Sequence, residues 1–161
     1  MINISTHTHA HTSKMELTHV SHWKTDIFQN ITQEAHGKPQ GLWWSYPEDW
    51  IKFAQPSYKW IAHTTVTYKS NFIFIDMSKE VSLNSFIALY KLNGLDNEID
   101  WPKVQINYSG IFFQNVDKMP KHYWQKYNKS DGCWILSIDV DSLCVWKPSA
   151  LGEIVWKRKN K

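Results

Sequence analysis

Residues 15–54 read MELTHVSHWKTDIFQNITQEAHGKPQGLWWSYPEDWIKFA, and they concentrate polar and aromatic side chains that have no evident packing role. Residues 17–21 predict a short strand that carries His19, and residues 41–45 predict a second strand that begins at Gly41. Between them, residues 38–41 predict a turn, because proline fixes φ and glycine permits a positive φ. Residues 47–54 predict the start of a helix, with one proline and two acids in its first turn. Together these elements could form a wall for a flat aromatic ligand.

The composition predicts one folded domain. The chain has 161 residues, of which 42% are hydrophobic, and this length is enough to bury a sizeable core. Ten tryptophans point first to a core built from large rings, since each ring buries much apolar area. So many rings in a small domain also leave room for a stacking site.

The basic residues are unevenly placed. Lysine and arginine total 18 against 15 acids, but four of the bases lie in residues 157–161, which leaves a body of 14 against 15. A body that is nearly neutral argues against extensive binding to a phosphate backbone. We expect residues 157–161 to form a solvated basic tail, with weak contact to nucleic acid or another acidic partner as the alternative.

Targeting and cysteine patterns predict a cytoplasmic protein with no membrane partner. Residues 1–14 contain alternating histidines among Ser and Thr and no apolar segment, so we expect a disordered His-rich leader and no signal peptide. No apolar run approaches the roughly 20 residues that a membrane-spanning helix needs. Two cysteines, Cys133 and Cys144, are too few for a disulfide framework, and no Cys-x-x-Cys pair suggests zinc. A single disulfide between them is the alternative.

The rest of the chain predicts alternating strands and short helices. Residues 58–68 and 71–76 predict two strands with a connection of hairpin length. Residues 78–90 predict a helix with Ser82 as a candidate N-cap. A strand is expected after the turn at residues 108–110, residues 117–131 predict a loop with one helical turn, and further strands are expected at 133–140, 143–146 and 154–156. The predicted fold is a single α+β domain over residues 15–156, with mixed or split antiparallel β-sheets and a few short helices.

The order of these motifs resembles the ADP-ribosyltransferase superfamily, whose members use NAD. Residues 17–21, LTHVS, are similar to the family's first-strand pattern Leu-Tyr-His-Gly-Thr, and residues 41–45, GLWWS, to its second-strand pattern of Gly, aromatic and Ser. Residues 108–111, YSGI, resemble a Tyr-Asp-Gly-Val turn, and residues 144–151, CVWKPSAL, resemble the strand end that follows the catalytic glutamate. The resemblance implies an ADP-ribosyltransferase-like fold.

By the same resemblance, the protein is mono-ADP-ribosyltransferase-like and uses NAD as a substrate to modify a macromolecular acceptor, either protein or nucleic acid. Cleavage of the nicotinamide–ribose bond leaves positive charge on the ribose, which a carboxylate stabilises in the transition state. The family's glutamate would fall near residues 141–143, but no glutamate occurs between Glu98 and Glu153, and Asp141 is the nearest carboxylate. The implied catalytic residues are His19, Ser45 and Asp141, and the implied NAD-binding residues are His19, Val20, Ser21, Gly41, Trp43 and Ser45.

Strand alternation divides the second-strand motif between two faces. Trp43 and Ser45 share one face, and Leu42 and Trp44 share the other. We therefore expect Trp43 with Ser45 as the ligand-facing pair, with Trp43 stacking on nicotinamide, and Trp44 as a core residue.

Other functions fit the same residues. The fold without a glutamate could be a non-catalytic module that binds a nucleotide or an exposed base by stacking. A Trp-rich surface could also dock another protein. In purely structural roles, His19 and Ser45 would satisfy local backbone and Asp141 would start a turn. The sequence contains no Gly-x-Ser-x-Gly elbow, P-loop, His-Glu-x-x-His or Gly-x-Gly-x-x-Gly motif.

Overall fold

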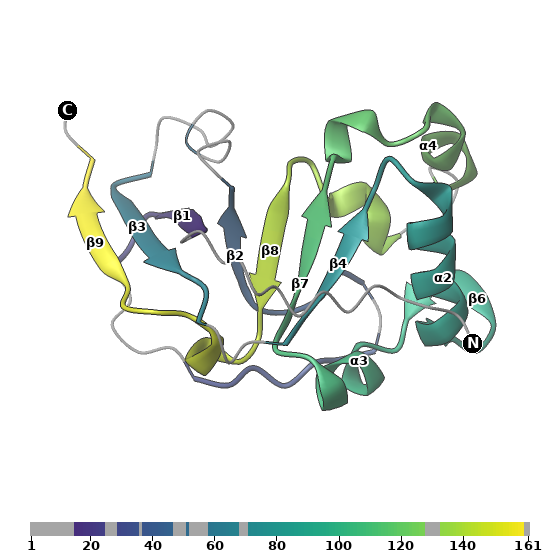
Figure 1. Ribbon diagram of the computed structural model, residues 1–161, viewed down its shortest axis with the longest axis horizontal. Coiled ribbons are helices and arrows are strands. Elements are labelled where there is room, and N and C mark those ends of the chain that lie inside the picture. The colour runs from purple at the N-terminus through teal and green to yellow at the C-terminus, as the bar shows by residue number, and fades with distance from the viewer. Residues whose placement is uncertain are drawn as a thin grey trace.

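A seven-stranded sheet runs through the molecule (Figure 1). The computed structural model describes residues 15–24, 29–35, 37–46, 51, 58–67, 71–127 and 133–159. The expected leader at 1–14 and nearly all of the expected helix at 47–54 lie outside these residues. The strands of the large sheet are β1 (Glu16–Ser21), β2 (Leu42–Ser45), β3 (Trp60–Thr65), β4 (Phe72–Asp76), β7 (Gly110–Gln114), β8 (Ser142–Val145) and β9 (Val155–Arg158).

The helices are short. They are α2 (Glu80–Tyr90), α3 (Trp101–Asn107) and α4 (Lys121–Tyr127), with 3-10 turns η1 (Val116–Lys118), η2 (Trp134–Ser137) and η3 (Pro148–Ala150). A small hairpin, β5 (Lys91–Leu92) and β6 (Leu95–Ile99), separates α2 from α3. Asn93 and Gly94 both adopt positive φ between its strands, as a tight hairpin turn requires.

The sheet is mixed, and its strand order is β4-β7-β8-β2-β1-β3-β9. Within the described residues, β4 and β7 are the only parallel neighbours, because the chain between them crosses over through α2, the small hairpin and α3. The remaining neighbours in the sheet run antiparallel. The structure is a single α+β domain with a mixed sheet and few helices, which confirms the expected fold class at this level.

The sheet is weakly joined at its middle, between β1 and β2. Thr18 opposite Ser45 is the register pair between these strands. By contrast, β1 pairs with β3 from Glu16 opposite Thr65 to Ser21 opposite Trp60, and β2 pairs with β8 along its full length. The sheet therefore consists of two well-paired halves, β4-β7-β8-β2 and β1-β3-β9.

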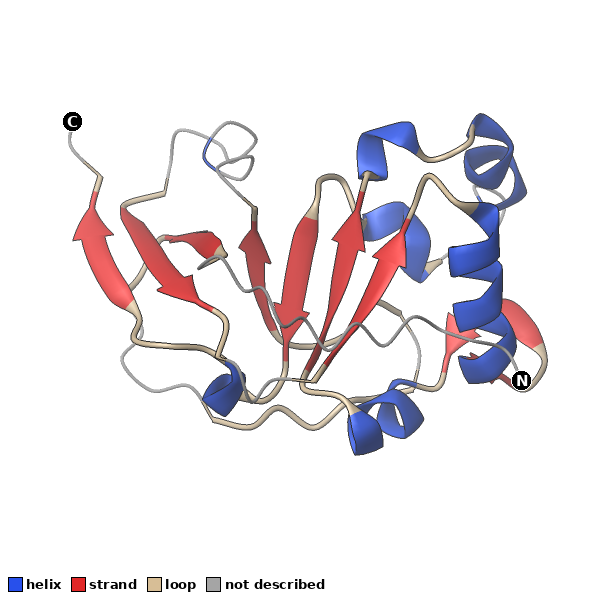
Figure 2. Cartoon of the chain, in the orientation of Figure 1, coloured by secondary structure: helices blue, strands red, loops and turns tan. Residues whose placement is uncertain are grey.

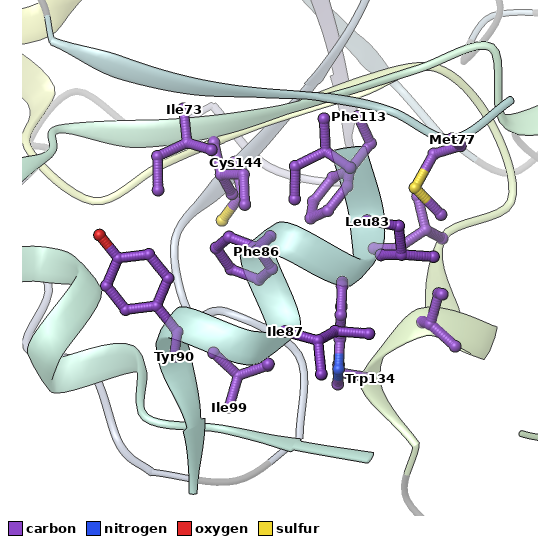
Figure 3. Close-up of a cluster of buried hydrophobic side chains, with 14 of the residues drawn as sticks. Ile73, Met77, Leu83, Phe86, Ile87, Tyr90, Ile99, Phe113, Trp134 and Cys144 are labelled. Carbon is purple, nitrogen blue, oxygen red and sulfur yellow. The ribbon is translucent and has the colours of Figure 1, made fainter. Parts of the chain in front are cut away.

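Each face of the sheet carries its own apolar cluster. One face supplies Ile73, Phe113 and Cys144, which pack beneath α2, α3 and η2 (Figure 3). The opposite face holds Leu17, Trp44 and Phe112, together with residues near η3. Because side chains alternate along a strand, successive residues of β2 and β8 contribute to different clusters. Helices α2, α3 and α4 gather at the β4 and β7 end of the sheet (Figure 2).

The expected hairpin between residues 58–68 and 71–76 is wrong. Both strands form, but β3 pairs with β1 and β9, whereas β4 pairs with β7 at the other edge of the sheet. The short connection suggested that β3 and β4 are neighbours in the sheet. Instead, the pairing of β3 with β1 and β9 sets its position.

Two further expectations are corrected. Residues 133–140 form the 3-10 turn η2 and not a strand, and they bury Trp134 and Ile135 under α2. Ser82 is not the N-cap of α2, which begins at Glu80 after Lys79. Instead the Ser82 hydroxyl accepts a hydrogen bond from the backbone N–H of Asp76.

Phe86 of α2 anchors the larger cluster, and its ring lies 5.8 Å from the rings of both Trp101 and Trp134 (Figure 3). We expect Phe86→Ala to lower the free energy of unfolding by about 3–5 kcal/mol, because it removes a fully buried ring and leaves a cavity. Val81→Ala on the same helix is the matched control, since Val81 is 78% exposed and its loss should cost under about 0.5 kcal/mol. Urea unfolding at equilibrium measures both, and equal losses would contradict this packing.

Candidate functional site

His19 lies where β1 and β2 separate. Its Nδ1 is 2.7 Å from the backbone carbonyl oxygen of Trp43, so Nδ1 carries the proton and donates to β2. At the residue after Thr18, the His19 side chain therefore makes the contact between the two strands. This bond fixes the ring orientation and leaves Nε2 as the acceptor nitrogen of a neutral imidazole.

Burial keeps His19 neutral. Loss of hydration lowers the pKa of His19 from its ordinary value, and the bond to Trp43 opposes this only in part. At neutral pH the ring therefore offers one fixed donor and one acceptor, which suits recognition of a hydroxyl group.

Two tryptophan rings flank His19. The Trp44 ring centroid is 5.5 Å from that of His19, and the Trp156 centroid is 6.1 Å away in an edge-on arrangement. Trp44 is fully buried, as expected of a core residue, and among the described residues its indole Nε1–H has no hydrogen-bond partner. A buried N–H without an acceptor lowers the stability of the folded state, and this one belongs to a ring that lies beside His19.

Trp43 and Ser45 lie on the opposite face from Trp44, as strand alternation predicts, but both are engaged in the fold. The Trp43 ring stacks on Phe113 at 6.2 Å between centroids, and the Lys38 ammonium lies 5.2 Å from the Trp43 centroid. A ligand ring that stacked on Trp43 would have to replace one of these contacts. Ser45 has no exposed surface, and it lies opposite Ser142 in β8 and Thr18 in β1.

Asp141 holds the start of η1. Its carboxylate Oδ1 accepts a hydrogen bond of 2.8 Å from the backbone N–H of Val116. Asp141 precedes Ser142, and Ser142 is two strands away from Thr18, the neighbour of His19. With strands about 4.8 Å apart, the main chains at His19 and Asp141 are separated by about 10 Å or more.

The remaining expected NAD-binding residues have structural partners. The Ser21 hydroxyl accepts a hydrogen bond from the Trp23 backbone N–H at 3.2 Å, and Val20 lies opposite Ile61 in β3. Gly41 is required by close packing, because a Cβ there would lie 2.6 Å from the Val145 carbonyl oxygen. Of the residues proposed from sequence, His19 and Ser21 share one face of β1, with Val20 on the other.

Asp76, which sequence reasoning did not single out, anchors a polar cluster at the end of β4. Its Oδ1 accepts hydrogen bonds from the Ser78 N–H and hydroxyl and from the Asn115 side-chain amide. Partial burial alone would raise the pKa of Asp76, but hydrogen bonds from Ser78, Lys79 and Asn115 lower it to about 2. The carboxylate is satisfied by the loops that it joins, so the cluster is structural.

The described residues offer neither a metal site nor a reactive thiol. No group of three His, Cys, Asp or Glu residues among them is arranged to hold a metal ion. Cys133 and Cys144 are both buried and are not joined in a disulfide, and burial raises the pKa of the Cys144 thiol well above its usual range. Of the helices in the described part of the chain, none is long and apolar enough to cross a membrane.

Comparison with known proteins assigns no family. No protein-family model, curated protein or solved structure matches this chain.

The lowered pKa of His19 makes stability depend on pH. The unfolded state binds a proton near pH 6.5 and the folded state only at lower pH, so this stabilisation is present above pH 6.5 and is lost as pH falls. We expect the free energy of unfolding to drop less steeply between pH 7.5 and 5.5 in His19→Ala than in the wild type. At pH 7.5 the variant should lose about 1 kcal/mol or more, since the Trp43 carbonyl loses its donor.

His22→Ala is the matched control, because the His22 side chain is exposed and its loss should cost under about 0.5 kcal/mol at pH 7.5. Urea midpoints across the pH range give the comparison. A His19→Ala profile parallel to the wild type would show that His19 titrates alike in both states.

Proposed function

We propose that this domain is an ADP-ribosyltransferase-like protein that binds NAD where β1 and β2 separate. The observation that carries the proposal is the state of His19, a partly buried neutral ring whose Nδ1 is bound to the Trp43 carbonyl. Its Nε2 is then an oriented acceptor for a ribose hydroxyl. The position of this histidine on the first strand is also the position that the sequence resemblance implies.

The residues around His19 fit a nucleotide in chemical type. A ribose supplies hydroxyl donors for the imidazole, and the Trp44 N–H beside the same ring is a buried donor that no described residue accepts from. Ser21 lies on the same face of β1, two residues farther along the strand. In this proposal Trp43, Ser45 and Gly41 contribute indirectly. They set the position of β2, and His19 binds the backbone of that strand.

Asp141 is the proposed source of the carboxylate that stabilises positive charge on the ribose. Its hydrogen bond to the Val116 N–H leaves further acceptor capacity, because a carboxylate has about four lone-pair sites. The separation of about 10 Å from His19 requires the ligand to span from β1 across β2 to the start of β8. As part of the same proposal, the acceptor is a protein or nucleic acid, and the protein acts in the cytoplasm.

A non-catalytic nucleotide-binding module is the second candidate. It is favoured by the engagement of Asp141 with the start of η1 and by the lack of any glutamate between Glu98 and Glu153. Such a module would bind NAD through His19 and leave it intact.

Binding of NAD should stabilise the folded state, because a ligand that binds only that state shifts the equilibrium by mass action. At 100 times the dissociation constant, we expect the free energy of unfolding to rise by about 2.7 kcal/mol. His19→Ala should lose most of this gain, whereas the exposed control His22→Ala should keep it. Urea unfolding with and without NAD measures the effect, and no stabilisation of the wild type would overturn the proposal.

Release of nicotinamide separates the two candidates. If Asp141 stabilises the transition state, Asp141→Asn should reduce the release rate by about 100-fold or more, the range seen when one electrostatic group is removed from an active site. Asparagine keeps an oxygen for the Val116 N–H, so the turn at η1 should persist. Release by the wild type that Asp141→Asn leaves unchanged would remove Asp141 from the chemistry, and stabilisation without release would favour the binding module.

A further inference from the structure

The outer corner of the β1-β3-β9 half of the sheet collects aromatic and basic side chains. These residues are far apart in the sequence, and the pairing of three strands brings them together (Figure 1). We refer to this surface as the aromatic-basic corner, and its residues are Trp23, Lys59, Trp60, Trp156, Arg158 and Lys159.

Strand register assembles the corner. Ser21 lies opposite Trp60, and Trp60 lies opposite Arg158, so the three form one row across the half sheet. In a parallel row two residues along, Ala62 lies between His19 and Trp156. The row order puts Trp60, Arg158 and Trp156 on the same face, because cross-strand partners and residues two apart share a face. Lys59 and Lys159 are each one residue from this row, so the corner spans both faces at the end of these strands.

Main-chain bonds extend the pairing past the strand ends. The Lys59 N–H donates to the Ser21 carbonyl at 3.0 Å, and the Lys159 N–H donates to the Lys59 carbonyl at 2.9 Å. Residues expected from sequence to form a solvated tail are therefore partly built into the sheet, since β9 runs to Arg158.

Trp23 is the exposed ring of the corner, whereas Trp60 and Trp156 are partly buried. Trp23 is 75% exposed, and the ammonium group of exposed Lys59 lies 5.9 Å from its ring centroid. The Lys159 ammonium lies 4.1 Å from the centroid of Tyr58, a buried ring. The exposed contact between Lys59 and Trp23 is worth about 0.5–1 kcal/mol, so a flat ligand ring could replace it.

Charge at the corner has one sign. Residues 20–24, 58–62 and 155–159 contain five lysines and arginines and no aspartate or glutamate. In the part of the chain that the structure describes, β9 pairs with β3 alone, so its outer edge carries these cations without another strand beside it. Five of the 18 lysines and arginines of the protein thus lie at this corner beside its aromatic rings.

From this combination, we propose that the aromatic-basic corner binds single-stranded nucleic acid. Cations match the phosphates, and the exposed Trp23 ring matches a base, whose faces are accessible in a single strand and covered in a duplex. An acidic peptide would use the cations but leave Trp23 without a stacking partner. The proposal depends on Trp23 and on the cations of β9 and not on the His19 imidazole, although Trp156 of the corner also contacts His19.

Fluorescence anisotropy with a labelled 12-nucleotide oligo(dT) tests the binding of a single strand. The wild type should bind in a saturable manner, and Trp23→Ala should weaken binding about fivefold or more, whereas Trp23→Phe should keep most of the affinity. Trp23 is largely exposed, so both variants should fold, which circular dichroism checks.

Lys59→Gln/Arg158→Gln tests the cations, with Lys118→Gln/Lys121→Gln as a control of equal charge near α4 at the far end of the molecule (Figure 1). The corner variant should reduce the slope of log affinity against log salt by about 1.4, because each phosphate contact in a single strand contributes about 0.7. The control variant should keep the wild-type slope.

Three outcomes would overturn the proposal. These are no saturable binding of oligo(dT), equal loss in the corner and control variants, and binding of heparin that matches oligo(dT) while Trp23→Ala has no effect. The last outcome would assign the corner to acidic polymers in general. An NAD-binding failure with intact oligonucleotide binding would leave this proposal standing.

Discussion

The join between β1 and β2 is the constraint on which the rest of the structure depends. Thr18 and Ser45 form the register pair, and the His19 ring then donates to the Trp43 carbonyl in place of further strand pairing. A side chain that bridges two strands holds the halves together and lets them diverge. The arrangement also explains why a histidine sits in a strand beside fully buried Trp44, since the ring serves the backbone of β2.

Much of the fold follows from local sequence pattern, and the errors lie in long-range pairing. The strands at β1, β2, β4 and β8 could be predicted because apolar and β-branched residues bounded by turn residues mark them. The partner of β3 could not, since a short connection suggested β4 whereas the stable pairings are with β1 and β9. Residues 133–140 carry the same apolar signal as a strand, but tertiary packing of Trp134 under α2 makes them a 3-10 turn.

At the candidate site, too, the local pattern was predicted and the contacts between distant elements were not. Alternation correctly separated Trp43 and Ser45 from Trp44, because side chains in any strand alternate. Sequence could not reveal that Phe113 and Lys38 cover the Trp43 ring, nor that Asp141 binds the Val116 amide, since both contacts join elements distant in the chain. The basic residues near the C-terminus looked separate for the same reason, and only the pairing of β9 with β3 joins them to Trp60.

The strand order also bears on when the protein can fold during synthesis. Each half of the sheet takes strands from both ends of the chain, since β2 pairs with β8 and β3 pairs with β9. A ribosome must therefore release β8 before the first half is complete, and β9 before the second half is complete. Until then β1, β2 and β3 have exposed edges and apolar faces, which are features that promote association between unfinished chains. Such non-local pairing also favours slow folding. A chaperone that covers nascent strands would therefore assist this protein more than a helical bundle of equal length.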